Sequence, residues 1–246
     1  RHGFTTVSQN SVDAVADRDF VAETLFALTL LATHLSRLAE DMILFGSGEF
    51  GFLRFGDAFS TGSSMMPQKR NPDVFEIARG SAARMLGDLT TVLATLKGLP
   101  SGYNKDLQDD KRPLFDAVDT MMLVVPAVAG ALDEVPFDHK RMRAAVSAGL
   151  MATDLADYLV DRGVSFRDAH SAVGKLVREA ETAGVELDAL PFSSFAAAHA
   201  TFGADVLNAL KPELSIARRN LPGGTGPDAV REQLAAAVKA LAGTPG

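Results

Sequence analysis

The segment from Thr61 to Asn71 (TGSSMMPQKRN) combines residue types that could do acid–base chemistry on an anionic substrate. Its Gly and Ser residues make it flexible, and its hydroxyls lie close in sequence to two cations, Lys69 and Arg70. The segment runs into a predicted helix start, with Asn71 as the N-cap followed by Pro and Asp. Backbone N–H groups, a helix dipole and a lysine together favour a bound anion. A solvated polar loop between two helices is the alternative interpretation.

The elements that must position this segment are predicted to be long helices. After Arg18, apolar residues recur at spacings of three and four, which is typical of a helix packed against near-parallel helices. This predicted seam consists of Leu28, Leu31, Leu35, Leu38, Met42 and Phe45. Gly46 is expected to end the helix, which would then be about 42 Å long at 1.5 Å per residue.

Further helices are expected along the rest of the chain. One follows Asn71 and ends before Gly98, and another runs from Pro113 to Leu132. Shorter ones are expected at 138–148, 152–162, 166–183, 192–201 and 227–242. The sequence therefore predicts an all-α protein, with a long-helix bundle over residues 1–135 and a small helical carboxyl-terminal domain over residues 136–246.

The composition of the 246 residues excludes several functional classes. The absence of Cys excludes disulfides and thiolate metal sites, and it fits the cytoplasm. A net charge of −7 argues against a nucleic acid partner. The run from Met121 to Leu132 is too short to span a bilayer, so no membrane partner is expected. The cluster of Asp106, Asp109 and Asp110 lacks the Gly and Glu of a calcium loop, so no metal is expected.

The Thr61–Asn71 segment resembles the signature loop of the fumarase/aspartase superfamily. That loop runs Gly-Ser-Ser-x-Met-Pro-x-Lys-x-Asn-Pro, and every fixed position has its counterpart between Gly62 and Pro72. Within the superfamily, Gly98-Leu99-Pro100 and the stretch 103–111 (YNKDLQDDK) resemble the argininosuccinate lyase branch. The stretches 9–11, 17–20 and 217–225 are similar to it as well.

The resemblance implies a role for each matching residue. Ser63 would be the general base, with Ser64 beside it binding substrate. Lys69 and Asn71 would bind the succinyl carboxylates, and Lys69 would meet the charge that develops there. Glu76 would pair with a catalytic His. The other implied substrate contacts are Arg18, Tyr103, Gln108 and Lys111.

Each of these roles has a structural alternative. Glu76 could simply complement the helix dipole, and Arg18 could form a salt bridge with Asp17 or Asp19 at a helix start. The stretch 103–111 could be an ordinary polar turn.

The implied reaction is the cofactor-free β-elimination of argininosuccinate to arginine and fumarate, a step of arginine biosynthesis. Members of the family are homotetramers whose active sites draw on three subunits. Their chains are much longer than this one. The family's amino-terminal region, with its His-Thr-His stretch, is therefore expected to be missing, and the chain alone is expected to be inactive. A non-catalytic scaffold of the same fold is an alternative, as is a sister lyase that acts on adenylosuccinate or aspartate.

Overall fold

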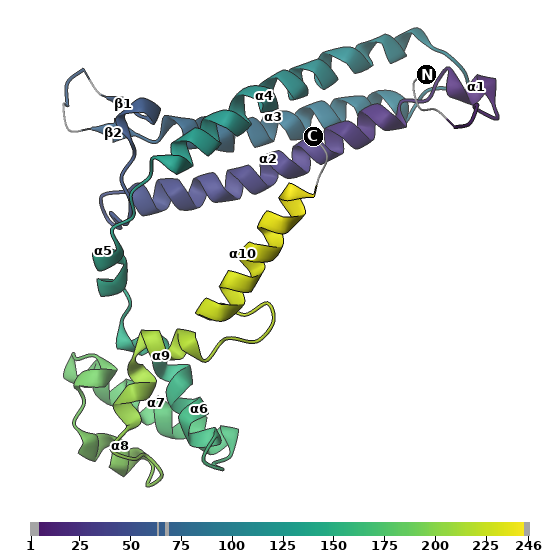
Figure 1. Ribbon diagram of the computed structural model, residues 1–246. Coiled ribbons are helices and arrows are strands. Elements are labelled where there is room, and N and C mark those ends of the chain that lie inside the picture. The colour runs from purple at the N-terminus through teal and green to yellow at the C-terminus, as the bar shows by residue number, and fades with distance from the viewer. Residues whose placement is uncertain (1–4, 63, 67–68, 244–246) are drawn as a thin grey trace. The chain divides into compact units, whose positions relative to one another are not determined.

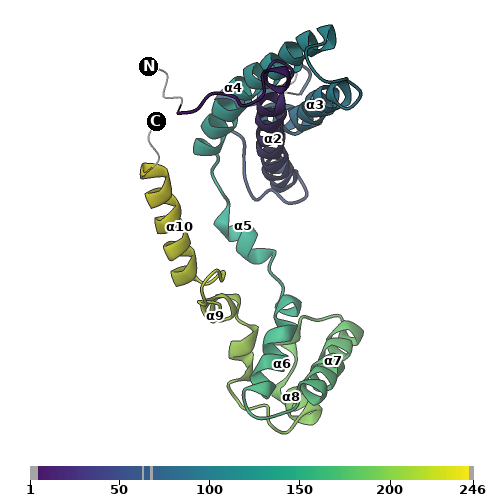
Figure 2. The same cartoon turned by 90° about the vertical axis from the view of Figure 1, so that its right-hand side faces the viewer.

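The computed structural model describes residues 5–62, 64–66 and 69–243 (Figures 1 and 2). Among these residues the chain is mostly helical, so the predicted all-α class is confirmed. The chain divides into two compact units, Arg1–Arg141 and Met142–Gly246. The division falls inside the short helix α5 (His139–Ala144), whereas the sequence places the domain boundary at residue 135.

The first unit is built on three long helices that lie side by side (Figure 1). They are α2 (Asp19–Gly46), α3 (Asp73–Leu96) and α4 (Lys111–Asp133). A single turn, α1 (Ser11–Ala14), precedes them. The 28 residues of α2 start and end where the sequence predicts, which gives a helix of about 42 Å.

The helices of this unit enclose two clusters of buried side chains, one near each end. Val21, Leu25 and Met85 belong to the cluster at the start of α2, and Ala39 and Phe75 belong to the other. Beside the first cluster, the Thr29 hydroxyl donates a hydrogen bond of 3.1 Å to the carbonyl oxygen of Met85. This bond satisfies a buried polar group and ties α2 to α3.

The predicted seam of α2 coincides only in part with this core. Leu28, Leu35 and Leu38 are half-buried, and Leu31 stays 43% exposed. The fully buried positions belong to a neighbouring row in which Ala32 and Ala39 allow close approach of the other helices. Leu28, Leu35 and Leu38 pack against the edges of the two clusters, so Leu31 is the exposed position of the seam.

The prediction that Asn71 caps α3 is wrong. Asn71 lies instead in strand β2 (Arg70–Asn71), which pairs antiparallel with strand β1 (Thr61–Gly62). Its side-chain amide donates to the Thr61 hydroxyl oxygen at 3.2 Å, and Pro72 occupies the cap position of α3. The Asn71 side chain is therefore used in the strand pair and does not cap the helix.

Helix α4 carries a largely uncovered apolar face. Phe115, Met122 and Leu123 are each at least 60% exposed. By length and composition alone the stretch Lys105–Asp133 could cross a membrane, a test that core helices of soluble proteins also pass. The physical consequence is an apolar surface that stays unpaired within the described part of this chain.

The second unit folds around a core of its own. It contains α6 (Ala152–Val160), α7 (Phe166–Ala183), α8 (Phe192–Ala198), α9 (Pro212–Ala217) and α10 (Pro227–Ala242). Leu155, Leu176 and Phe195 are fully buried at its centre. The bounds of α7 and α10 are those predicted, and α9 is a helix that the sequence did not predict.

Candidate functional site

The Thr61–Asn71 segment is closed at its base by the β1–β2 pair and fixed to the start of α3. The backbone N–H of Thr61 donates to Asp73 Oδ2 at 2.7 Å. Burial alone would raise the pKa of Asp73, but the hydroxyl and backbone N–H of Thr61 and the charge of Lys69 outweigh this effect and lower it. Asp73 is therefore an ionised anchor for the segment, whereas the sequence indicated only that it belongs to a helix start.

Within this segment, the predicted base Ser63 lies outside the described residues, as do Pro67 and Gln68. Ser64 and Lys69 are exposed, and Asn71 is half-buried. The backbone N–H of Lys69 donates to the carbonyl oxygen of Met66 at 3.0 Å. Arg70 forms an ion pair of 2.5 Å with Asp57 on the neighbouring 3-10 turn.

Glu76 lies in the first turn of α3 with an exposed side chain. Its backbone N–H donates to the carbonyl oxygen of Pro72 at 2.9 Å, which begins the helix ladder. The nearby Arg79 pairs with Glu40 of α2 at 2.6 Å. The Glu76 carboxylate therefore remains exposed to solvent within the described part of the chain.

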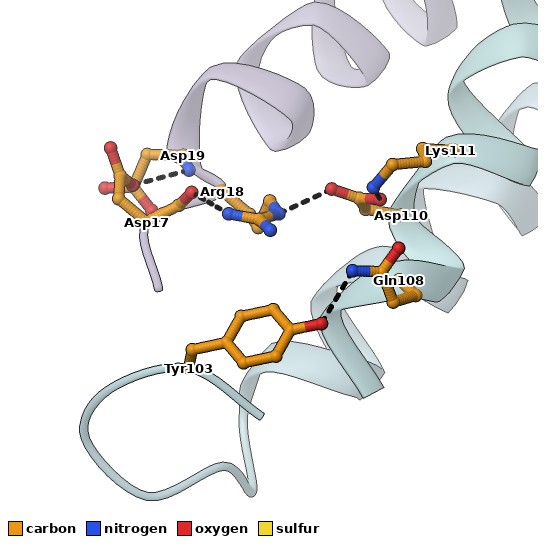
Figure 3. A network of polar contacts seen from close by, with 7 residues as sticks. All are labelled: Asp17, Arg18, Asp19, Tyr103, Gln108, Asp110 and Lys111. Atoms are coloured by element: carbon orange, nitrogen blue, oxygen red, sulfur yellow. Dashed lines mark hydrogen bonds and ion pairs between the residues drawn. The ribbon is translucent and has the colours of Figure 1, made fainter. Parts of the chain in front are cut away.

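A second cluster gathers the remaining predicted residues around Asp110 (Figure 3). Arg18 Nε lies 2.5 Å from Asp110 Oδ2, and Lys111 Nζ lies 2.7 Å from Asp110 Oδ1. The side chains of Arg18 and Asp110 are only 14% and 10% exposed. Gln108 Nε2 donates to the Tyr103 hydroxyl oxygen at 2.6 Å. The 3-10 turn Lys105–Asp110 carries Gln108 and Asp110 directly before the start of α4.

The electrostatics of this cluster depend on Asp110. Burial would raise its pKa, but the hydrogen bond from Lys111 and the ion pair with Arg18 stabilise the carboxylate, so the pKa is lowered. The alternative considered for Arg18, a salt bridge with Asp17 or Asp19, does not form; Arg18 Nη1 instead donates to the Asp17 carbonyl oxygen at 2.7 Å. Asp110 lies far from Arg18 in sequence, so no local pattern pointed to this pair.

A hollow of about 530 Å³ opens beside Arg18. Its walls come from α1, the start of α2 and the connector after α3, including Asp13, Ser101 and Gly102. It is large enough for a small organic molecule. Among the described residues, no group of three His, Asp or Glu side chains is arranged to hold a metal ion.

The two clusters lie at opposite ends of the first unit. Arg18 immediately precedes α2, whereas Thr61 and Asn71 follow the other end of that helix (Figure 1). The length of α2 separates them by about 40 Å. Since no small substrate spans this distance, one copy of the chain cannot bring both clusters to the same molecule.

Two family models match the chain. A model described as "Lyase" matches residues 2–87, and one described as "Argininosuccinate lyase C-terminal" matches residues 149–217. An argininosuccinate lyase of Roseiflexus sp. (strain RS-1) is 60% identical over 235 residues, which is 96% of this chain. The chain is a homologue of argininosuccinate lyase. The predicted resemblance is thereby confirmed.

Other relatives agree with this assignment. Argininosuccinate lyases of Herpetosiphon aurantiacus and Anaeromyxobacter sp. (strain K) are 55% and 51% identical, each over 98% of this chain. The argininosuccinate lyase homologue spans about half the length of these relatives, namely 52% of the Roseiflexus protein.

Solved structures support the fold of the homologue. An EDDS lyase in complex with formate is 28% identical with a TM-score of 0.84, covering 95% of this chain and 48% of that one. A class II fumarase from Schistosoma mansoni has a TM-score of 0.70 at 19% identity over 85% of this chain and 42% of that one, and it supports the fold alone.

Proposed function

We propose that this protein takes part in the β-elimination of argininosuccinate to arginine and fumarate, a step of arginine biosynthesis. The observation that carries the proposal is the Gly62–Pro72 motif, held on a β-pair against α3 in a chain 60% identical to an argininosuccinate lyase. The reaction requires a base, a stabiliser for carboxylate charge and an acid for the departing nitrogen, and it requires no cofactor.

The signature segment is assigned the proton abstraction. Ser63 acts as the general base and removes the proton next to a succinyl carboxylate. A free hydroxyl is a poor base, so the dipole of α3 and the charge of Lys69 are needed to stabilise the alkoxide. Lys69, with Ser64 and Asn71, binds the succinyl carboxylates and stabilises the negative charge that builds up there. Glu76 orients a His supplied by another segment.

The Asp110 cluster is assigned the opposite side of the substrate. Arg18 and Lys111 hold a carboxylate, and Tyr103 and Gln108 contact the arginine part. These side chains are already paired with one another or with Asp110, which limits their motion. Such preorganisation keeps the entropic cost of binding low.

An active site of this kind requires several copies of the chain. The two clusters lie at opposite ends of a helix of about 42 Å, and only another copy can bring the second cluster to the first. Exposed apolar side chains of α2, such as Leu30 and Leu31, and the exposed apolar face of α4 are surfaces on which copies can pack. We propose a homotetramer in the cytoplasm, completed by a segment that corresponds to the remaining half of the relatives' length.

Fumarate release is the direct test of the activity. The chain is incubated with argininosuccinate, adenylosuccinate or aspartate, alone and after co-expression with the amino-terminal half of the Roseiflexus relative, and the ultraviolet absorbance of fumarate is followed. We expect release from argininosuccinate only, and only from the complemented protein. Release of fumarate from adenylosuccinate or aspartate would show that the protein is a sister lyase acting on that substrate. Folded, complemented protein without any release would favour a scaffold role.

A mixing experiment tests whether the sites are shared between copies. Ser63→Ala and Lys111→Ala variants of the complemented protein should each be inactive. After they are mixed, dissociated and reassembled, some sites receive an intact signature segment from one variant and an intact Asp110 cluster from the other. We expect partial recovery of activity. Absence of recovery, with mixed tetramers present by mass spectrometry, would contradict shared sites.

A further inference from the structure

A groove of about 330 Å³ runs between α6 and α7 in the second unit. None of the residues assigned above lies in it. Its floor is made of Ala152, Ala156, Val173 and Val177, and Phe166 lines it near the start of α7. The groove is therefore mainly apolar, with small side chains that leave room for a ligand.

One ridge of α7 gives the groove its polar character. Phe166, His170, Gly174 and Arg178 follow one another at intervals of four residues, so they lie along the same side of the helix. Gly174 has no side chain, so it leaves a notch in the ridge between two basic residues. A Cβ placed on Gly174 would lie 3.6 Å from Arg178 Nη1. The Arg178 guanidinium thus reaches back over the notch, as helix side chains do.

The basic groups at the notch have no anionic partner. The guanidinium of Arg178 forms no hydrogen bond or ion pair with any described residue, although the backbone carbonyl oxygen of Arg178 accepts a hydrogen bond from the Thr182 hydroxyl. The His170 ring lies 6.2 Å from the Phe166 ring between centroids, and it forms no hydrogen bond or ion pair with a described residue. Among the described residues that line the groove there is no Asp or Glu. The groove therefore combines an apolar floor with uncompensated positive charge.

We propose that this groove binds a small apolar carboxylate with an aromatic or branched body. The body packs on the Ala and Val floor between α6 and α7. The carboxylate enters the notch at Gly174, where the planar guanidinium of Arg178 donates two parallel hydrogen bonds and His170 donates a third. Tight binding needs both the apolar body and the carboxylate of the ligand. A neutral molecule contacts only the apolar floor, and a small anion contacts only the basic groups at the notch.

Ligand titration followed by NMR on the whole chain tests the proposal. 3-Phenylpropionate is the probe, 3-phenylpropionamide is its neutral isostere, and acetate is the carboxylate without an apolar body. We expect saturable shifts of the Gly174 and Val177 amides with the first compound. Binding of the other two should be at least about tenfold weaker, because each lacks one set of contacts. Equal binding of the amide, or shifts located elsewhere, would overturn the proposal.

Three variants test whether binding of 3-phenylpropionate depends on the notch at Gly174. Arg178→Gln should weaken binding of 3-phenylpropionate by about tenfold or more. Arg167→Gln removes the same charge from α7 at an exposed position outside the groove, and it should change nothing. Gly174→Leu fills the notch and should abolish binding, with an unchanged far-UV spectrum. Equal weakening by the two arginine variants would overturn the proposal. So would self-association through these residues without any ligand shift, which would mean that a second copy covers the groove.

Discussion

The carboxylate of Asp110 lies between Arg18 and Lys111, with its two oxygens 2.5 Å from Arg18 Nε and 2.7 Å from Lys111 Nζ. It therefore joins the residue that precedes α2 to the first residue of α4 (Figure 3). Both cations are among the proposed substrate contacts. Asp110 thus holds them in place and offsets part of their mutual repulsion before a substrate carboxylate arrives.

Replacing Asp110 should destabilise the first unit. In Asp110→Asn, the largely buried guanidinium of Arg18 loses its anionic partner. We expect a loss of about 3 kcal/mol in the free energy of unfolding, the lower end of the range for breaking a buried pair. Urea unfolding at pH 7 measures the loss. Asp109→Asn is the control, because Asp109 is the exposed neighbour. Similar losses in the two variants would contradict this assignment.

The same pair should make stability depend on pH. The pKa of Asp110 is lowered in the folded state, so the carboxylate contributes stability above its unfolded-state pKa of about 3.9. That contribution is lost as the pH falls through the folded-state pKa. The difference in unfolding free energy between wild type and Asp110→Asn should therefore shrink steadily below about pH 4. A difference that stays constant down to pH 2 would refute the depressed pKa as its origin.

Loss of the Asp73 anchor should slow catalysis. Asp73→Ala removes the acceptor of the Thr61 N–H and frees the base of the signature segment. A hydrogen bond to a charged group contributes about 2 kcal/mol, so fumarate release by the complemented protein should slow about thirtyfold. Asp73→Asn keeps an acceptor and should restore part of the rate. Asp57→Asn, which breaks only the exposed pair with Arg70, should have little effect.

The proposed base can be tested in the same assay. Ser63→Ala should abolish fumarate release by the complemented protein while the far-UV spectrum stays unchanged, because the substitution removes only one hydroxyl group. Ser64→Ala should retain more activity, since the family motif assigns the base to the first Ser. A Ser63→Ala variant with normal turnover would disprove the assignment.

A separate prediction concerns the second unit. Asp154 is 3% exposed; it accepts hydrogen bonds from the Ser215 hydroxyl at 2.9 Å and from Arg219 Nη1 at 3.1 Å, which ties α6 to α9. Asp154→Ala should cost about 3 kcal/mol, because Arg219 and Ser215 lose their partner. Hydrogen exchange should accelerate in α6 and α9 but not in α3, which belongs to a different core. Exposed Asp157 is the control position.

Local patterns in the sequence determined much of this protein. The spacing of apolar residues indicated the helical class, because helix periodicity depends on residues three and four apart, and Gly46 indicated the end of α2. The motif from Gly62 to Pro72 likewise made the family resemblance recognisable, because its residues are adjacent in the chain. These features depend on residues that are close together in the sequence, so they can be recognised without knowledge of the tertiary structure.

Contacts between distant segments were decided only by the tertiary structure. Asn71 belongs to a strand and not to a helix cap, because it pairs with Thr61 and donates a hydrogen bond to the Thr61 hydroxyl oxygen. Sequence rules for helix caps do not include such a contact with an earlier segment. Asp110 pairs with Arg18 because α2 and α4 begin at the same end of the first unit. The length of α2 also places the signature segment and the Asp110 cluster at opposite ends of that unit. Such pairings depend on how the helices pack. Packing brings together residues that are far apart in the sequence, and no local sequence pattern indicates which of them will meet.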